Sequence, residues 1–421
     1  MKASGIEWIG DIPRSWKIIK VKDGFVQKKA KAYQNDPVIL TLARDGVKIR
    51  DISTNEGQIA SSYFEYNPVE PLDMLLNPMD LQSGANCSLS KVSGVISPAY
   101  INLRYKPGYD PSFYDYYFKY QYWSFAFFAH GKGVSFENRW TLNNETLMNY
   151  PLIAPSYEEQ QCIADYLDSK CTEIDALSAD IQKQIEKLEE YKRSVITEAV
   201  TKGLDPNAEM KDSGIKWIGE IPEKWSINRV ANLFAERNEP GDEKLPFLSV
   251  SINSGISDKE LSEEEMTRQF VRADAAKNKR VYPGDIVYNM MRAWQGAIGA
   301  VRTDGMVSAA YVTARPLSNI DTRYYEYLLR TPTAIQEMNK YSYGIMDFRK
   351  RLYWSYFRII TLCVPPLEEQ KAIADYADFI SQEIKELINL KKQQLSTLEE
   401  YKKSVIYEYV TGKKEVPDAT I

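Results

Sequence analysis

Histidine and cysteine are scarce in this sequence, and their scarcity limits the chemistry that the chain can support. Among 421 residues there are one histidine, His130, and four cysteines, Cys87, Cys162, Cys171 and Cys363. Histidine serves most general-base and triad mechanisms, but His130 lies in the aromatic stretch WSFAFFAHGKG, where we expect a structural role. Without a CxxC pair, a zinc site with about four well-spaced ligands is not expected. We expect free thiols in a reducing compartment.

Long apolar runs and nucleotide-binding motifs are also missing. The N-terminus has no apolar segment of signal-peptide length and no stretch reaches about 18 apolar residues, so we expect a soluble, cytoplasmic protein. GKGVS (131–135) and GKKEV (412–416) do not fit a phosphate-binding loop. NPVE (67–70) and NPMD (77–80) depart from the NPP(Y/F) box of adenine methyltransferases. We therefore predict no catalytic residues, no bound cofactor and no metal in this chain.

An internal duplication organises the sequence. The box SGIEWIGDIPRSW at 4–16 recurs as SGIKWIGEIPEKW at 213–225, an offset of 209 residues. A second motif, beginning PSYEEQQCIADYL at 155, recurs as PPLEEQKAIADYA at 365, an offset of 210 residues. Two motifs that repeat at nearly one offset predict two copies of one unit. VEPLDMLLN and VYPGDIVYN correspond more weakly between them, so one scaffold carries two different surfaces.

The second motif of each copy predicts a long helix. Residues 156–202 of the first copy lack Gly and Pro, and their apolar residues form a coiled-coil-like stripe. Ser156 with the following glutamates is typical of a helix start, and Gly203 of a stop. Each helix of about 45 residues would be roughly 65–70 Å long. The residues that we expect along the two stripes are Leu167, Ile174, Ile181, Leu188 and Val195, with Ile163, Leu177, Ile185 and Tyr191 beside them, and Ala377, Ile384, Leu398 and Val405, with Ile373, Ile380, Leu387 and Tyr401 beside them.

The intervening segments predict two compact domains. Short β-branched and aromatic runs alternate with turn signals, and each copy has one helical stretch, 111–129 and 321–340. The predicted fold class is α+β, with two pseudo-twofold-related α/β domains separated by two long antiparallel coiled-coil-like helices. The predicted limits are 1–154 for the first domain, 155–203 for the central helix, 204–364 for the second domain, 365–413 for the distal helix and 414–421 for a tail.

The distribution of charge favours nucleic-acid binding by the two domains. The net charge is −5, but residues 17–155 contain 15 Lys and Arg against 13 Asp and Glu, and residues 226–364 contain 19 against 16. The acidic excess therefore lies on the helices and linkers, and positive faces are needed only where phosphates pass. Lysines would contact phosphates, and Arg, Asn and Gln in loops after strands would read base edges. For any one residue a solvated surface position is an equal alternative. The candidates are Lys28, Lys29, Lys31, Asn77, Gln82, Asn86 and Arg139 in the first domain and Lys277, Lys279, Arg280, Asn289, Arg292, Gln295, Arg349, Lys350 and Arg351 in the second.

The repeated box and the repeated EEQ..IADY...LEEYK.S.I.E.VT helix resemble the specificity subunit of type I restriction–modification systems. The resemblance covers the whole chain, and both motifs occur twice. It implies two target recognition domains that read a split site in double-stranded DNA, with the helices as spacers that set the unread gap. It implies no catalysis by this chain. The implied partners are two methyltransferase subunits, which would bind S-adenosylmethionine, and restriction and translocation subunits.

Other functions remain open from the residues alone. A lone nuclease or methyltransferase would need metal ligands, and only scattered carboxylates such as Asp242 and Glu243 are available. A coiled-coil scaffold without DNA would share the long helices but would not show salt-dependent DNA binding. A specificity subunit of a related restriction system with different catalytic partners is the alternative nearest to the main interpretation.

Overall fold

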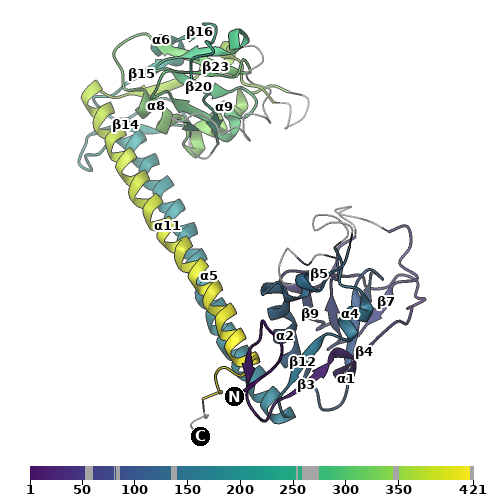
Figure 1. The fold of residues 1–421 in the computed structure, drawn as a ribbon. Coiled ribbons are helices and arrows are strands. Elements are labelled where there is room, and N and C mark those ends of the chain that lie inside the picture. The colour runs from purple at the N-terminus through teal and green to yellow at the C-terminus, as the bar shows by residue number, and fades with distance from the viewer. Residues whose placement is uncertain are drawn as a thin grey trace. The chain divides into compact units, whose positions relative to one another are not determined.

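A computed structural model describes residues 1–52, 60–79, 81, 86–133, 140–252, 255–257, 275–344 and 350–417. The chain divides into two compact units, drawn as ribbons in Figure 1. Unit 1 comprises Met1–Ile181 and Lys392–Ile421, and unit 2 comprises Gln182–Lys391. The division falls inside the two long helices, so each unit combines one domain with half of each helix.

Unit 1 is built on a four-stranded antiparallel sheet in the order β4-β11-β8-β9. These strands are β4 (Phe25–Gln27), β11 (Ile101–Tyr105), β8 (Met74–Leu76) and β9 (Cys87–Leu89). Two-stranded pairs surround this sheet: β1 (Lys2–Ala3) with β2 (Asp11–Ile12), β3 (Lys17–Lys20) with β12 (Pro151–Ala154), β5 (Leu40–Ala43) with β6 (Gly46–Ile49), and β7 (Asn67–Val69) with β10 (Gly94–Ile96). Its shorter helices are α1 (Val21–Gly24), α2 (Pro111–Trp123), α3 (Ala126–Ala129) and α4 (Asn144–Met148).

Unit 2 repeats this plan with a four-stranded sheet in the order β16-β23-β20-β21. Its strands are β16 (Phe234–Arg237), β23 (Tyr311–Pro316), β20 (Ile286–Asn289) and β21 (Ile298–Ala300). The pairs are β13 (Met210–Asp212) with β14 (Glu220–Pro222), β15 (Ser226–Arg229) with β24 (Thr361–Val364), β17 (Val250–Ser251) with β18 (Gly255–Ile256), and β19 (Lys279–Val281) with β22 (Gly305–Val307). The helices are α6 (Val230–Leu233), α8 (Thr322–Leu329), α9 (Pro332–Lys340) and α10 (Trp354–Phe357), with the 3₁₀ turns η1 (Ala275–Lys277) and η2 (Ala293–Gln295).

The shared sheet order confirms the internal duplication at the level of topology. One local expectation differs, because each predicted helical stretch is divided in two. In unit 1 the break between α2 and α3 passes through Phe125, whose backbone is left-handed at φ 59°. In unit 2 the side chain of Thr331 caps a new helix, α9, that begins at Pro332. Proline has no N–H to donate and is favoured in the first helical turn, so it starts α9 rather than continuing α8.

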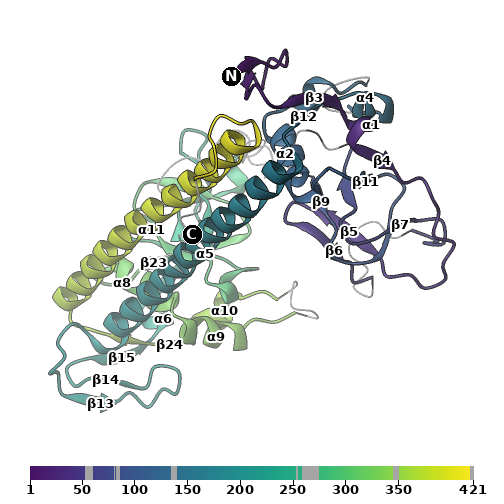
Figure 2. The same cartoon turned by 90° about the horizontal axis from the view of Figure 1, so that it is seen from below.

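The two long helices confirm the predicted antiparallel arrangement. They are α5 (Tyr157–Lys202) and α11 (Leu367–Val410), and they run side by side in Figure 1 and in the rotated view of Figure 2. At the start of α5, Ser156 and Glu159 form a reciprocal capping box, which satisfies two otherwise unpaired N–H groups. In unit 1, the ammonium of Lys402 lies 2.7 Å from an oxygen of Asp175.

The apolar stripe is narrower than the sequence indicates. Leu167, Ile174 and Ile181 are buried in α5, as are Ala377 and Ile384 in α11. Four residues expected beside the stripe are instead exposed, with 49%, 57%, 45% and 56% of their surface accessible: Leu177, Tyr191, Leu387 and Tyr401. A two-helix contact buries only a narrow seam on each helix, so flanking heptad positions stay outside it.

Each repeated box packs into the core of its unit, next to the end of a long helix. In unit 1, Trp16 is 3% exposed and shares a core with Val410 at the end of α11. In unit 2, Trp225 is 1% exposed and shares a core with Val200 near the end of α5. The first box therefore packs against α11, the helix of the second copy, and the second box packs against α5, the helix of the first copy.

Replacing Gly412 with alanine is expected to destabilise unit 1. Gly412 follows α11 at φ +68°, and an added Cβ would lie 2.4 Å from Cδ of Pro13. A left-handed alanine costs roughly 1–2 kcal/mol, and the contact with the proline ring adds to this cost. Thermal unfolding of the full chain, followed by hydrogen exchange of unit 1 peptides, measures the loss. Gly5→Ala is the matched control, because Gly5 has φ +70° with no atom within 4 Å of the added Cβ. Equal losses in the two variants would contradict the steric argument.

Candidate nucleic-acid interface

The loop that follows β20 in unit 2 carries three of the predicted base-reading residues. The Asn289 side-chain oxygen accepts a hydrogen bond from the Met291 N–H at 3.0 Å, which forms a tight turn. Arg292 and Gln295 are exposed on the next turn, η2, and Gly296 ends it at φ 94°. A buried strand therefore delivers two long polar side chains to solvent on a short, hydrogen-bonded loop.

A second segment of unit 2 lies beside this loop. Tyr343 and Arg351 exchange backbone hydrogen bonds at 3.1 and 2.9 Å, and the Leu352 N–H donates to the Met290 carbonyl at 2.8 Å. The Lys350 ammonium lies 5.7 Å from the centre of the Trp294 ring. The structure thus brings Lys350 and Arg351 next to the loop of Asn289, Arg292 and Gln295. Arg349 lies outside the described residues.

The basic cluster around β19 reaches the same end of the sheet. Lys279 donates a hydrogen bond from its ammonium to the Tyr311 carbonyl at 2.8 Å, and Tyr311 is the cross-strand partner of Asn289. Burial lowers the pKa of the Lys279 ammonium. The Arg280 guanidinium lies 4.6 Å from the centre of the Tyr282 ring, and Lys277 is exposed in η1. Seven of the eight described candidates of unit 2 therefore lie on or next to β19, β20 and the loop after β20, and Arg351 is joined to that loop through Leu352.

The corresponding loop of unit 1 repeats the turn of Asn289. The Asn77 side-chain oxygen accepts a hydrogen bond from the Met79 N–H at 3.0 Å, and its backbone N–H donates to the Asn86 carbonyl at 2.8 Å. The Asn86 side chain is only 6% exposed, so burial keeps it from solvent. Lys132 and Thr141 exchange backbone hydrogen bonds beside this loop, as Tyr343 and Arg351 do in unit 2. Gln82 and Arg139 lie outside the described residues.

The lysines at the start of unit 1 differ in their surroundings. Lys28 lies 2.9 Å from a carboxylate oxygen of Asp73, whose side chain has no exposed surface, and 3.0 Å from Glu70. Lys31 donates to the Asn67 side chain at 3.3 Å, whereas Lys29 is exposed. A phosphate would have to compete with buried carboxylate for Lys28, so Lys29 is the better placed of the three for a phosphate contact.

The sequence analysis did not predict the pairing of Lys28 with the buried Asp73, nor the corresponding ion pair in unit 2. There the Arg237 guanidinium lies 3.1 Å from an oxygen of Asp285, which is 1% exposed. Burial raises the pKa of the Asp285 carboxyl, and the nearby Arg237 opposes that effect. The two aspartates occupy the same place in VEPLDMLLN and VYPGDIVYN. An acidic residue repeated just before two buried strands was the available signal for a buried ion pair.

The residues that attach each domain to its helices were also missed. The Tyr116 hydroxyl donates to Asp168 at 2.6 Å in unit 1, and the Tyr327 hydroxyl donates to Asp378 at 2.6 Å in unit 2. The buried amides of Gln160 and Gln370 make a second matched set, since each accepts from the backbone N–H of the residue that caps α2 or α8. These tyrosines and glutamines fix each domain on its helix.

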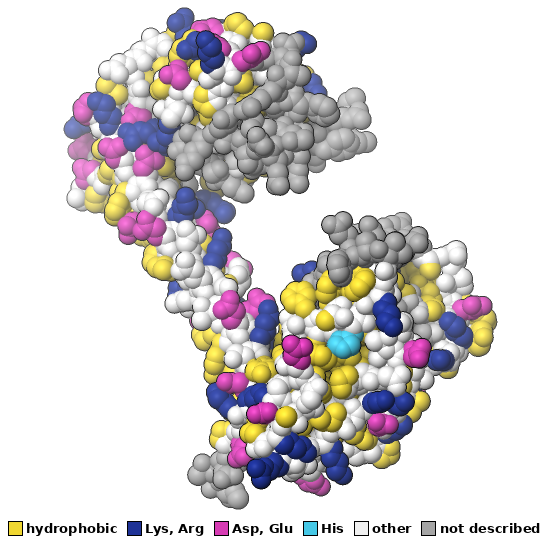
Figure 3. All heavy atoms as spheres, viewed as in Figure 1, with side chains coloured by type: hydrophobic (Ala, Val, Ile, Leu, Met, Phe, Trp, Pro, Cys, Tyr) yellow, Lys and Arg dark blue, Asp and Glu magenta, His cyan; other side chains and the backbone are white. Residues whose placement is uncertain are grey.

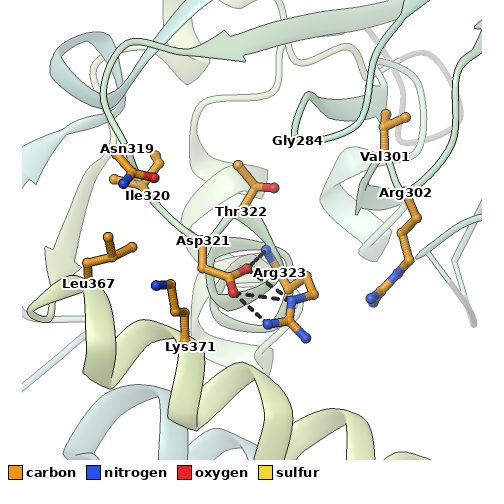
Figure 4. A pocket seen from close by; sticks show the side chains of 10 residues that line it. All are labelled: Gly284, Val301, Arg302, Asn319, Ile320, Asp321, Thr322, Arg323, Leu367 and Lys371. Carbon is orange, nitrogen blue, oxygen red and sulfur yellow. Dashed lines mark hydrogen bonds and ion pairs between the residues drawn. The ribbon is translucent and has the colours of Figure 1, made fainter.

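A hollow of about 390 Å³ lies in unit 2 where α8 begins beside α11 (Figure 4). Arg323 forms ion pairs there with Asp321 at 2.6 Å and with Asp378 at 2.9 Å. Arg302 also pairs with Asp378, at 3.3 Å, and Lys371 pairs with Glu368 at 2.8 Å. Because carboxylates neutralise these cations, the hollow belongs to the attachment of the domain and is not a phosphate site.

The remaining described surface is mixed in charge. On the face drawn in Figure 3, Lys and Arg side chains alternate with acidic and neutral ones over both units. The described residues include no group of His, Cys, Asp and Glu that could hold a metal ion. In the same ranges no helix is both long enough and apolar enough to cross a membrane. All four cysteines are free, and the His130 ring packs edge-on against Trp8 with centroids 4.9 Å apart.

Comparisons with known proteins match both the second copy alone and most of the chain. Residues 210–411 match the family described as Type I restriction modification DNA specificity domain. The type I restriction enzyme MjaVIII specificity subunit of Methanocaldococcus jannaschii is 25% identical, over 96% of this chain and 94% of its own length. Residues 210–411 thus resemble a type I restriction modification DNA specificity domain, and the chain as a whole is similar to a type I restriction enzyme specificity subunit.

Other specificity subunits match in part or in fold. A putative MjaX specificity subunit from the same organism is 25% identical over 66% of this chain, and the match spans 63% of that relative's length. A solved structure titled "Structural basis underlying complex assembly and conformational transition of the type I R-M system" has a TM-score of 0.69, 13% identity, and coverage of 96% of this chain and all of its own. At that identity the likeness shows a shared fold alone.

Proposed function

We propose that this chain is the DNA sequence-specificity subunit of a type I restriction–modification complex, which recognises a bipartite site in double-stranded DNA. The observation that carries the proposal is that two units of one topology present unlike side chains at equivalent loop positions. Asn77 after β8 in unit 1 and Asn289 at the end of β20 in unit 2 form the same kind of turn. The position beside this turn is Lys132 in unit 1 and Tyr343 in unit 2. Two unlike surfaces on one repeated scaffold suit two unlike half-sites.

Phosphate contacts would position each unit, and a few side chains would select the bases. In unit 2 the exposed Arg292, Gln295 and Arg351 are the base-reading candidates, and in unit 1 Asn77 is the described candidate that is not buried. Each well-formed bidentate contact discriminates against a wrong base by roughly 1–3 kcal/mol. Lys29 and Lys277 are exposed and would contribute contacts that are independent of sequence.

The exposed apolar residues of the long helices provide a docking surface for partner subunits. Leu177 and Tyr401 lie on the helical parts of unit 1, and Leu387 and Tyr191 lie on those of unit 2. The duplication relates Leu177 to Leu387 and Tyr191 to Tyr401, each at an offset of 210 residues. Two equivalent sets of apolar side chains suit two copies of one partner, the methyltransferase subunit. S-adenosylmethionine would bind to that partner, and a restriction subunit would join the same complex.

The test is to map methylated adenines in a host that carries this chain with its methyltransferase partner. The variants are Asn77→Ala in unit 1 and Arg292→Ala with Arg351→Ala in unit 2. Each set is expected to relax the sequence requirement in one half of the methylated motif and to leave the other half unchanged. The discrimination between bases at an affected position should fall by about 5- to 150-fold in relative methylation rate, which corresponds to roughly 1–3 kcal/mol.

A matched control distinguishes base reading from general weakening. Lys29→Ala should lower methylation uniformly over all sites and should leave the motif unaltered, because a phosphate contact carries no sequence information. Host methylation that stays at one motif in all of the variants, with both halves intact, would contradict the assignment of these loops. An absence of any methylation that depends on this chain would contradict the proposed function.

A further inference from the structure

The two reading surfaces differ in polarity at positions that the duplication makes equivalent. The Leu142 N–H donates to the Pro78 carbonyl in unit 1, as the Leu352 N–H does to the Met290 carbonyl in unit 2. The residue after each leucine is the N-cap of a short helix, Asn143 of α4 and Tyr353 of α10. These matching bonds allow the side chains of the two surfaces to be compared position by position.

Unit 1 is polar at these positions, and unit 2 is aromatic. Unit 1 has Lys132, Asn143 and Thr146, whereas unit 2 has Tyr343, Tyr353 and Tyr356 at the corresponding positions. In unit 2 the rings of Tyr343 and Tyr356 lie 4.5 Å apart, and the two residues remain 53% and 37% exposed. Tyr353 is 43% exposed. Burying such rings would be favourable, so this surface is suited to a contact.

The positive charges around the rings of Tyr343 and Tyr356 indicate which ligand this surface binds. Arg351 is paired through its backbone with Tyr343, and both it and Arg292 are exposed. The adjacent Lys350 ammonium lies over the Trp294 ring at 5.7 Å. Apolar rings among cations match a DNA groove, in which apolar base groups lie between two lines of phosphates.

We propose that the half-site read by unit 2 is selected in part through thymine 5-methyl groups, which Tyr343 and Tyr356 contact in the major groove. This inference rests on the proposed DNA-reading function. The thymine methyl is the apolar group that a base pair presents in the major groove, and apolar side chains read it by contact. The half-site read by unit 1 depends instead on hydrogen bonds, because Asn143 and Lys132 offer polar groups. The half-site of unit 2 must accordingly contain thymine.

Deoxyuridine tests the proposal, because it differs from thymidine by that methyl group alone. The complex of this chain with its methyltransferase partner is titrated with duplexes of the mapped site, in which the thymines of one half-site at a time are replaced by deoxyuridine. Replacement in the half assigned to unit 2 is expected to weaken binding by about fourfold for each methyl that is buried. Replacement in the other half should change the dissociation constant by less than about twofold.

Substitutions of Tyr343 and Tyr356 test whether these two rings make the contact with the methyl group. Tyr343→Ser with Tyr356→Ser should bind thymine and deoxyuridine duplexes equally, whereas Tyr343→Phe with Tyr356→Phe should keep the discrimination, since the rings make the contact. Lys132→Ala in unit 1 is the matched control and should also keep it. Because the two tyrosines are exposed, the serine variant should fold normally, and circular dichroism of the complex verifies this.

Each outcome separates the inference from the function on which it rests. Normal binding of the target with no loss on deoxyuridine substitution in either half would overturn the methyl contact and leave the DNA-reading function intact. A serine variant that fails to assemble with the methyltransferase, while discrimination persists in the native complex, would show that Tyr343 and Tyr356 bind protein and would overturn the assignment of the methyl contact to them. Failure of the native complex to select any DNA sequence would refute the proposed function itself.

Discussion

Insertion of seven residues into both α5 and α11 is expected to lengthen the unread gap of the target site by about three base pairs. Seven helical residues add about 10.5 Å at 1.5 Å each, and successive base pairs are 3.4 Å apart. The insertion points are between Ile181 and Gln182 and between Lys391 and Lys392, where the two units divide. A seven-residue insertion preserves the spacing of the apolar stripe, so the contacts inside each unit are retained.

The measurement is the methylation motif of a host that carries the lengthened chain. Both halves of the motif should be unchanged, and only the number of unspecified base pairs between them should increase. Insertion into α5 alone is the control, because it shifts the apolar seam of one helix against that of the other and should abolish methylation. A doubly lengthened chain that methylates sites with the original gap would refute the role of the helices as spacers.

Replacing Asp73 with alanine should destabilise unit 1 by about 1–3 kcal/mol, because the groups that donate to this buried carboxylate lose their acceptor. The Asp73 carboxylate has no exposed surface. It lies 2.9 Å from the Lys28 ammonium and 2.8 Å from Nε of Arg104, and it accepts a hydrogen bond from the Glu70 N–H at 2.8 Å. Removal of this carboxylate therefore leaves the Glu70 N–H without its acceptor, and among the described residues Lys28 and Arg104 keep only Glu70 as a carboxylate partner.

Hydrogen exchange of the full chain measures this loss unit by unit. Peptides from β8 and β11 in unit 1 should lose protection, and peptides from unit 2 should keep it. Asp45→Ala is the matched control, since Asp45 and Lys48 form an ion pair in which both side chains are exposed, and exposed pairs contribute little. Full protection of unit 1 in the Asp73 variant would show that the ion pair is dispensable.

The features that were readable from the sequence are those that a local pattern determines. The helix ends follow from a capping serine and a glycine, and Ser156 and Gly203 stand where α5 begins and stops. The duplication follows from a comparison of letters, and the shared sheet order confirms it. These signals need no knowledge of the neighbours that a side chain acquires in the folded chain.

What the sequence could not show depends on neighbours that are distant along the chain. A cluster of lysines predicts a basic surface, but only the fold brings Asp73 to Lys28, 45 residues away. Asn86 follows a predicted turn and is nevertheless buried, because its backbone carbonyl is held by Asn77. The heptad pattern does not indicate how wide a face a single partner helix covers, and so Leu177 and Tyr191 were wrongly placed beside the buried seam. Base contacts by the other candidates stay predictions.

The division of the units has a consequence for biosynthesis. Unit 2 is one continuous stretch, Gln182–Lys391, whereas unit 1 draws Val405, Ile406 and Tyr409 into its core from the last part of α11. A ribosome therefore releases every segment of unit 2 before the last pieces of unit 1 emerge. The domain made first is completed last, and until then the part of its N-terminal box that packs against the end of α11 has no cover. A nonsense codon after Lys391 would remove the last part of unit 1 and leave every residue of unit 2 in place. The damage would therefore fall on the amino-terminal domain, although the codon lies next to the sequence of the second domain.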